Sequence, residues 1–148
     1  MNSGKNEIHE GRRNVMGQVN KDKAALAAMA AGDLDEPVVM LNLLRYREAA
    51  GDGAGVDGLT GREAYEAYGR AFAKLHPRFG GEPVWMGRAL NSIIGDEEWD
   101  LVMLVRYPTR RQFVDMTRDP DYLAIAPIRA AALADSRLVE MTQLLPKA

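Results

Sequence analysis

The heptapeptide Val38-Val39-Met40-Leu41-Asn42-Leu43-Leu44 is the strongest indication of the fold, because six of its seven residues are apolar. A run this short is typical of a strand, whereas helices usually extend further. A strand with one solvated face alternates apolar and polar side chains, but this run is apolar at both parities. It therefore predicts a strand that is buried on both faces and lies in the centre of a sheet.

Helices are predicted on both sides of this strand. The alanine-rich residues 20–31 favour a short helix, with Asn20 as its N-cap and Gly32 at its C-terminal end. After the strand, the glycine-rich residues 47–61 predict a loop. Thr60-Gly61-Arg62-Glu63 then fits a capping box. The helix that follows carries one apolar stripe, formed by Tyr65, Tyr68, Phe72, Leu75 and Phe79.

The middle of the chain predicts a β-hairpin. Residues 84–94 and residues 99–107 are apolar stretches of strand length, and the turn Gly95-Asp96-Glu97-Glu98 separates them. Gly87, inside the first stretch, indicates a β-bulge or a close approach of the backbone. The two strands are expected to pair in antiparallel fashion.

A helical region and a last strand complete the chain. Thr109 and Gln112 fit a second capping box. Asp119 followed by Pro120 predicts a new N-cap with proline at the first helical position, so the region divides into two helices. Residues 138–145 predict a final strand, whose polar positions indicate an exposed edge.

The order of these elements is an extra N-terminal helix followed by β-α-β-β-α-β, which defines an α+β, ferredoxin-like sandwich. Right-handed crossovers place both main helices on one face of a four-stranded antiparallel sheet. The opposite face then carries large apolar side chains from residues 38–44 and 99–105. The alanine-rich helix has little side-chain area with which to cover them. We therefore expect a homodimer in which two sheets stack face to face.

The composition limits the classes of function. The 148 residues carry a formal net charge of −2, and 47% of them are apolar. This is enough for one packed domain, without the positive field that a nucleic-acid partner requires. The apolar runs are too short to span a membrane, and the absence of cysteine favours a cytoplasmic location. We expect an N-terminal arm at residues 1–19, one domain at residues 20–148, and neither a nucleic-acid nor a membrane partner.

Six short blocks carry a family resemblance, and they are Val38–Tyr46, Gly61–Tyr65, Gly80-Gly81, Trp99-Asp100, Val105–Thr109 and Asp119–Tyr122. In this order they resemble the signatures of the uncharacterised bacterial proteins catalogued as domain of unknown function 1330. The resemblance implies a dimeric α/β barrel of ferredoxin-like subunits. That superfamily includes small cofactor-free oxygenases, isomerases and haem-handling proteins. The resemblance implies no agreed reaction and therefore no set of catalytic residues.

Three polar residues interrupt the apolar strands and are candidate ligand-binding groups: Asn42, Arg88 and Arg106. A buried amide or guanidinium is costly unless it has a partner. Asn42 either hydrogen-bonds neighbouring structure or points toward a ligand. The two arginines either bind an anionic ligand or form ion pairs, for which the candidate partners are Glu82, Asp100 and Glu140.

His76 and Tyr65 are the candidate catalytic residues. His76 lies near the end of the first long helix, where it could act as a general base or haem ligand, or interact with the helix dipole. Tyrosines on a helical stripe are usually core residues with the hydroxyl at the rim, and the remaining alternative is a phenol that lines a pocket. Tyr68 and Tyr107 are ligand-binding candidates on this basis. Two histidines in a chain without cysteine cannot supply a three-histidine metal site, so we expect no metal and no cofactor.

Three functions remain open from the sequence. The first is a protein that binds a hydrophobic or anionic small molecule between sheet and helices, as a cofactor-independent enzyme of oxygenase or isomerase type. The second is a non-catalytic ligand-binding or assembly module. The third is a haem-handling protein, which requires His76 to reach the cavity.

Overall fold

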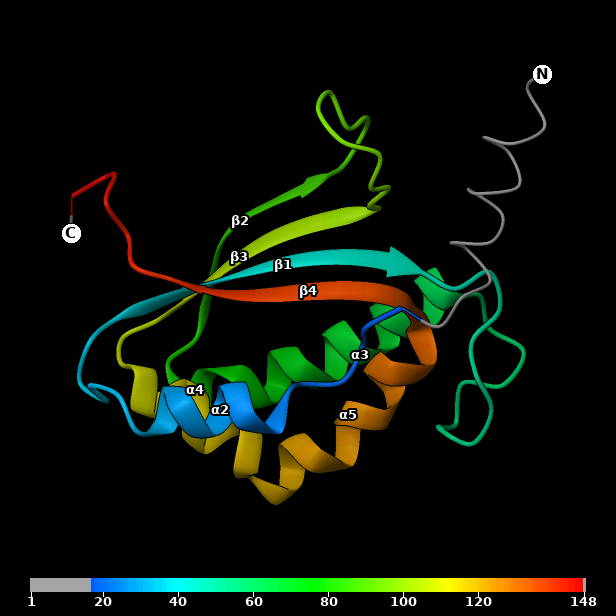
Figure 1. Ribbon diagram of the computed structural model, residues 1–148. Helices are drawn as coiled ribbons and strands as arrows, with labels where there is room; N and C mark the ends of the chain where they lie inside the picture. The colour runs from blue at the N-terminus through cyan, green and yellow to red at the C-terminus, as the bar shows by residue number, and fades with distance from the viewer. Residues whose placement is uncertain (1–16, 148) are drawn as a thin grey trace.

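The computed structural model describes residues 17–147, which fold as a four-stranded antiparallel sheet with helices on one side (Figure 1). The strands follow the order β2-β3-β1-β4 across the sheet. They are β1 (Val38–Tyr46), β2 (Glu82–Arg88), β3 (Leu101–Tyr107) and β4 (Leu133–Met141). The helices are α2 (Lys23–Ala30), α3 (Gly61–Leu75), the 3₁₀-helix η1 (His76–Phe79), α4 (Arg110–Arg118) and α5 (Pro120–Ala132). This is the expected α+β, ferredoxin-like fold, and β1 lies between β3 and β4 as expected.

The capping residues identified in the sequence predict the starts of the main helices correctly. Thr60 and Glu63 form the reciprocal capping box at the start of α3. Asp119 caps α5 by accepting a hydrogen bond from the Asp121 amide, with Pro120 at the first turn. At the start of α4, the Thr109 hydroxyl oxygen accepts a hydrogen bond from the main-chain amide of Gln112. The same hydroxyl donates to the side-chain Oε1 of Gln112 at 2.9 Å.

Several boundaries of helices and strands were predicted wrongly. The N-cap of α2 is Asp22 rather than Asn20, because the Asp22 carboxylate accepts hydrogen bonds from two amides of the first turn. β2 ends at Arg88, since residues 90–94 find no strand with which to pair. β4 begins at Leu133 rather than Leu138 and ends at Met141. The polar residues at its start are disfavoured in strands, but pairing with β1 outweighs that preference.

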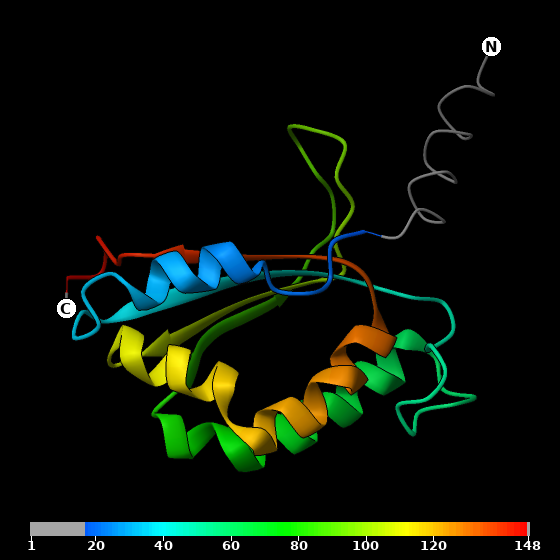
Figure 2. The same ribbon diagram turned by 60° about the horizontal axis from the view of Figure 1, so that its bottom comes forward.

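The helix-facing side of the sheet forms the core. Even-numbered residues of β1 and odd-numbered residues of β3 point toward the helices, and Leu44, Val38 and Tyr107 are almost fully buried there. Met29 of α2 belongs to the same cluster as Met40 and Phe113, so α2 packs on the helix side of the sheet. α2 therefore leaves the opposite face without cover from the helices (Figure 2).

The opposite face of the sheet, which we term the open face, is apolar across all four strands. The register places eight apolar residues on it, none of which belongs to either core cluster. These are Val39, Leu41, Leu43, Trp85, Val102, Leu104, Val139 and Met141. Trp85 is 55% exposed and Val139 is 45% exposed, so water reaches both edges of this surface.

Gly87 in β2 makes a close approach to a neighbouring side chain. A Cβ at this position would overlap the Trp85 ring. The irregularity in the pairing of β2 with β3 lies instead between Pro83 and Trp85. Of the two roles predicted for Gly87, the close approach is therefore the correct one.

Candidate functional site

A row of aromatic rings fills the space between α3 and the sheet. Neighbouring ring centroids along it are 4.4 to 5.8 Å apart. The row consists of Tyr46, Tyr65, Tyr68, Phe72, His76, Tyr107 and Phe113. It brings together four of the predicted site residues. Burial raises the pKa of Tyr65 to about 12 and also raises the pKa values of Tyr68 and Tyr107, so these phenols are neutral.

His76 is enclosed in this row. Its side chain is 5% exposed, and Nε2 has no hydrogen-bond partner among the described residues. The main chain at Gly81 lies against Nε2, where even a Cβ would overlap the imidazole. Burial lowers the pKa of His76, so the ring is neutral. This packing opposes the haem-ligand role, because iron bound at Nε2 would collide with the main chain.

His76 is expected to make the fold less stable in mild acid. Its lowered pKa means that the unfolded chain binds a proton below about pH 6.5 while the folded protein does not. Stability is therefore highest above that pH and decreases as the pH falls, by at most about 1.4 kcal/mol per pH unit. Urea unfolding between about pH 7.5 and 5.5 should show this slope for the native chain and a smaller one for His76→Gln. Equal slopes would show that His76 is protonated in the folded protein.

The three polar residues predicted to bind a ligand do not converge. Asn42 is buried on the helix side of β1, where its Nδ2 donates to the Met40 carbonyl at 3.2 Å. Arg88 is exposed at the end of β2. Arg106 lies on the open face and donates to Oε1 of Gln143 at 3.1 Å. The parity of β3 therefore directs Arg106 away from the space between sheet and helices, and its role in ligand binding remains a prediction.

A cavity of about 550 Å³ lies between α2 and the edge strand β4. Its apolar lining includes Leu26, Met29, Met40, Phe113 and Leu138. Charged residues also line it, namely Lys21, Asp22, Arg129, Arg137 and Glu140. Apolar walls with a few charged groups are typical of a small-molecule site. We refer to it as the α2–β4 cavity.

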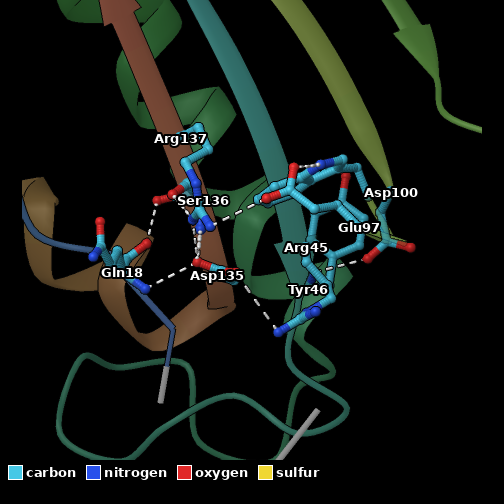
Figure 3. A network of polar contacts seen from close by, with 9 residues as sticks. Gln18, Arg45, Tyr46, Glu97, Asp100, Asp135, Ser136 and Arg137 are labelled. Atoms are coloured by element: carbon cyan, nitrogen blue, oxygen red, sulfur yellow. Dashed lines mark hydrogen bonds and ion pairs between the residues drawn. The ribbon is translucent and has the colours of Figure 1, made fainter. Parts of the chain in front are cut away.

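The chain at Gln18, which lines the cavity, is held in place by hydrogen bonds to the start of β4 (Figure 3). The main-chain amide of Gln18 donates to the Asp135 carboxylate at 2.9 Å, and the main-chain amide of Ser136 donates to the main-chain carbonyl of Gln18 at 2.8 Å. Burial alone would raise the pKa of Asp135, but hydrogen bonds from Arg137 and Gln18 lower it. Residues 17 to 19 of the predicted arm are thus fixed to the sheet, whereas residues 1–16 of that prediction lie outside the described residues.

Two cations of the cavity have no carboxylate partner among the described residues. Arg129, 8% exposed, donates from Nη1 to the Val19 carbonyl at 2.9 Å. Lys21 donates from Nζ to the Tyr122 hydroxyl at 2.6 Å. The other charges are satisfied: Glu140 pairs with Arg110 at 3.0 Å, and Arg137 pairs with Asp135 at 2.7 Å. The carboxylate of Asp22 caps α2.

Tyr122 is an unusual phenol for a buried position. Its side chain is 3% exposed, and burial alone would raise its pKa. The Lys21 ammonium, a hydrogen bond from the Tyr68 hydroxyl and the charge of Arg129 outweigh burial and lower that pKa. The phenolate is therefore stabilised at this position alone, while the other four tyrosines have raised pKa values.

Sequence reasoning missed Lys21 and Arg129. Lys21 belongs to a polar segment whose position depends on contacts with β4, which are distant in sequence. Arg129 left a signal, since it is the one charged residue in the apolar stretch of residues 123–134. A lone guanidinium in such a stretch must find a partner or a ligand. Tyr122 appeared in the sequence analysis only as the last residue of the family block Asp119–Tyr122.

The described residues include no group of three or more histidine, aspartate or glutamate side chains that could hold a metal ion. Across residues 17–147, none of the helices has the length and apolar character needed to cross a membrane.

The fold and the cavity define a ferredoxin-like α+β protein with room for a small organic molecule. The chain belongs to the family described as domain of unknown function DUF1330, which matches residues 56–142. The resemblance seen in the sequence is thereby confirmed. No functionally curated protein matches the chain.

The chain is also similar to several solved structures. RPA0582, a protein of unknown function from Rhodopseudomonas palustris, is 41% identical with a TM-score of 0.81, over 88% of this chain and 99% of that chain. The methylated RPA0582 protein is 39% identical with a TM-score of 0.83, over 90% of this chain and 100% of that one. A dimeric protein of unknown function and ferredoxin-like fold from Bacteroides fragilis is 13% identical, with a TM-score of 0.49, over 73% of this chain and 97% of that chain.

Proposed function

We propose that the protein binds a small anionic organic compound in the α2–β4 cavity. The observation that carries this proposal is the pair of cations, Lys21 and Arg129, that face an apolar-walled cavity without a carboxylate partner among the described residues. A bound carboxylate would supply the missing charge, and the apolar walls would hold its hydrocarbon part.

The same geometry bears on the three functions left open by the sequence. A non-catalytic module needs only the cations and the apolar walls. A cofactor-independent enzyme needs a group that moves a proton, and the contact of Lys21 with Tyr122 favours this alternative. His76 and Tyr65 lie in the aromatic row and are not among the residues that line the cavity, so their catalytic roles remain predictions.

Binding can be tested with naphthoate, an anion with an apolar ring system, and with uncharged naphthylmethanol as its matched control. Methionine methyl NMR separates the sites, because Met29 and Met40 line the cavity whereas Met86 lies exposed on β2. We expect naphthoate to shift the signals of Met29 and Met40 and to leave Met86 unchanged. We expect Lys21→Met and Arg129→Met each to weaken binding about tenfold or more, since contacts with charged groups contribute about 1.5–3 kcal/mol.

Arg118→Met is the control variant, because Arg118 is exposed on α4 and does not line the cavity. It should bind naphthoate as the native chain does. Equal affinity for naphthoate in the native chain, Lys21→Met and Arg129→Met would contradict the proposal. So would equal affinity of the native chain for naphthoate and naphthylmethanol.

We also propose that the protein forms a homodimer through the open face. The support for this is the apolar character of that face on all four strands, together with its exposure at Trp85 and Val139. Stacking two such sheets face to face would remove both surfaces from water. A cytoplasmic location remains a prediction from the composition.

A further inference from the structure

We propose that Lys21 and Tyr122 form a proton-transfer pair that acts on an organic acid with an enolisable C–H bond. This inference rests on the proposed binding of an anion in the α2–β4 cavity. The carboxylate of the acid would lie at Arg129, and the carbon that loses its proton would lie at the Lys21 amine.

The contacts of Lys21 carry the argument. Nζ lies 2.6 Å from the Tyr122 hydroxyl oxygen and also lies over the Tyr122 ring, 4.8 Å from its centroid. Lys21 lines the cavity, whereas Tyr122 does not. Among the described residues, no carboxylate pairs with this ammonium and fixes its proton. Lys21 is therefore the residue of the pair that would contact a ligand. Tyr122 is the residue that hydrogen-bonds the Lys21 ammonium and can exchange a proton with it.

Tyr122 is suited to that role because its oxygen has a second donor. The Tyr68 hydroxyl donates to it, and the charge of Arg129 acts on it as well. In the cationic state that binds the anion, the pair is ammonium with phenol. Loss of one proton leaves either ammonium with phenolate or amine with phenol, and the hydrogen bond between Nζ and the Tyr122 oxygen links these two forms. The second form presents a neutral amine to the cavity without uncovering a buried charge.

The step balances without a cofactor. The Lys21 amine takes the proton from the carbon beside the carbonyl group of the ligand, and the electron pair of the broken C–H bond passes into the enolate. Lys21 becomes an ammonium and Tyr122 remains a phenol. The ammonium then returns a proton to the enolate oxygen, which gives the enol tautomer, or to the carbon, which restores the acid with a proton that has exchanged with solvent at Lys21. Arg129, the second cation of the cavity, stabilises the negative charge that develops on the enolate.

The first test is a pH titration of tyrosine ionisation by near-ultraviolet absorption. The native chain should show one of its five tyrosines ionising below the usual value of about 10, and four above it. Tyr122→Phe should remove the early step, and Lys21→Met should move it to higher pH. Tyr107→Phe is the control and should leave the early step unchanged. A native chain without an early step would overturn the proposal.

The second test separates proton transfer from a purely structural contact. The probe is phenylpyruvate, which has a carboxylate, an apolar ring and an enolisable methylene group. NMR in D₂O follows exchange of its methylene protons. The native chain should accelerate this exchange, and both Lys21→Met and Tyr122→Phe should reduce the acceleration about 100-fold or more. Arg118→Met, which lies outside the site, should exchange protons at the native rate. Native-rate exchange in Tyr122→Phe would overturn the proposal.

Naphthoate binding distinguishes the failure of this inference from the failure of the proposed function. Tyr122→Phe removes no charge from the cavity and should bind naphthoate within about twofold of the native affinity. Binding without exchange in the native chain would leave the ligand-binding function intact and overturn the proton-transfer pair. If the native chain showed neither naphthoate binding nor accelerated exchange of the phenylpyruvate protons, both proposals would be overturned. If Tyr122→Phe fails to fold, Tyr68→Phe replaces it, since removing the second donor should raise the pKa of Tyr122 and slow the exchange.

Discussion

Replacement of Gly61 by alanine is expected to destabilise the protein by about 3 kcal/mol, near the upper end for overpacked positions. Gly61 is the first residue of α3, and its amide donates to the Arg47 carbonyl at 3.1 Å. A Cβ here would overlap the Arg47 carbonyl and would lie 2.7 Å from the Ala132 carbonyl. Both atoms belong to the main chain, and a hydrogen bond of 2.9 Å joins Arg47 to Ala132. The end of β1, the start of α3 and the end of α5 would all have to move apart.

Gly69→Ala provides a matched control in the same helix. Gly69 is exposed, and a Cβ at this position would meet no atom within 4 Å. Because alanine favours helix more than glycine does, this change should stabilise the protein by about 0.5–1 kcal/mol. Urea unfolding monitored by circular dichroism measures both changes. Similar free energies of unfolding for the two variants would contradict the close packing at Gly61.

Val139→Glu is expected to convert the proposed dimer into monomers while leaving the subunit folded. Val139 lies on the open face and is 45% exposed in the subunit, so its replacement should change the stability of a monomer by no more than about 0.5 kcal/mol. In a dimer that stacks the open faces, two unpaired carboxylates would be buried, one from each copy. The dimer dissociation constant should then rise about 100-fold or more.

Leu123→Glu is the matched control for this change. Leu123 is an exposed apolar residue of similar character, 55% exposed, but it lies on α5 in the helix layer. Sedimentation equilibrium should find the native chain and Leu123→Glu as dimers at micromolar concentration, and Val139→Glu as a monomer. A native chain that sediments as a monomer would contradict the proposed dimer.

The fold could be predicted from the sequence because its signals are local. The apolar run at residues 38–44 marks the central strand, and the Thr60 and Asp119 caps mark two helix starts. Each of these needs only residues within a few positions of one another. Strand ends were predicted less well, since the start of β4 at Leu133 depends on pairing with Tyr46, far away in the chain.

The candidate site could not be predicted in the same way. Asn42 and Arg106 interrupt apolar strands alike, yet the parity of each strand places one on the helix side and the other on the open face. Parity relative to the helices is a property of the assembled sheet and not of either segment. Lys21 approaches Tyr122 across 101 positions of sequence, so no short motif contains both residues.

The segment from Gly17 to Asp22, which is hydrogen-bonded to β4 at residues 17 and 18, lies outside the part of the chain that the family model matches. The family match begins at residue 56, after the segment that supplies Lys21 and the helix α2. Arg129, the other unpaired cation of the cavity, lies inside the matched segment, whereas the central strand β1 precedes it. Under the proposed function, a substitution at Lys21 would therefore change the charge of the cavity without altering any residue that the family model matches.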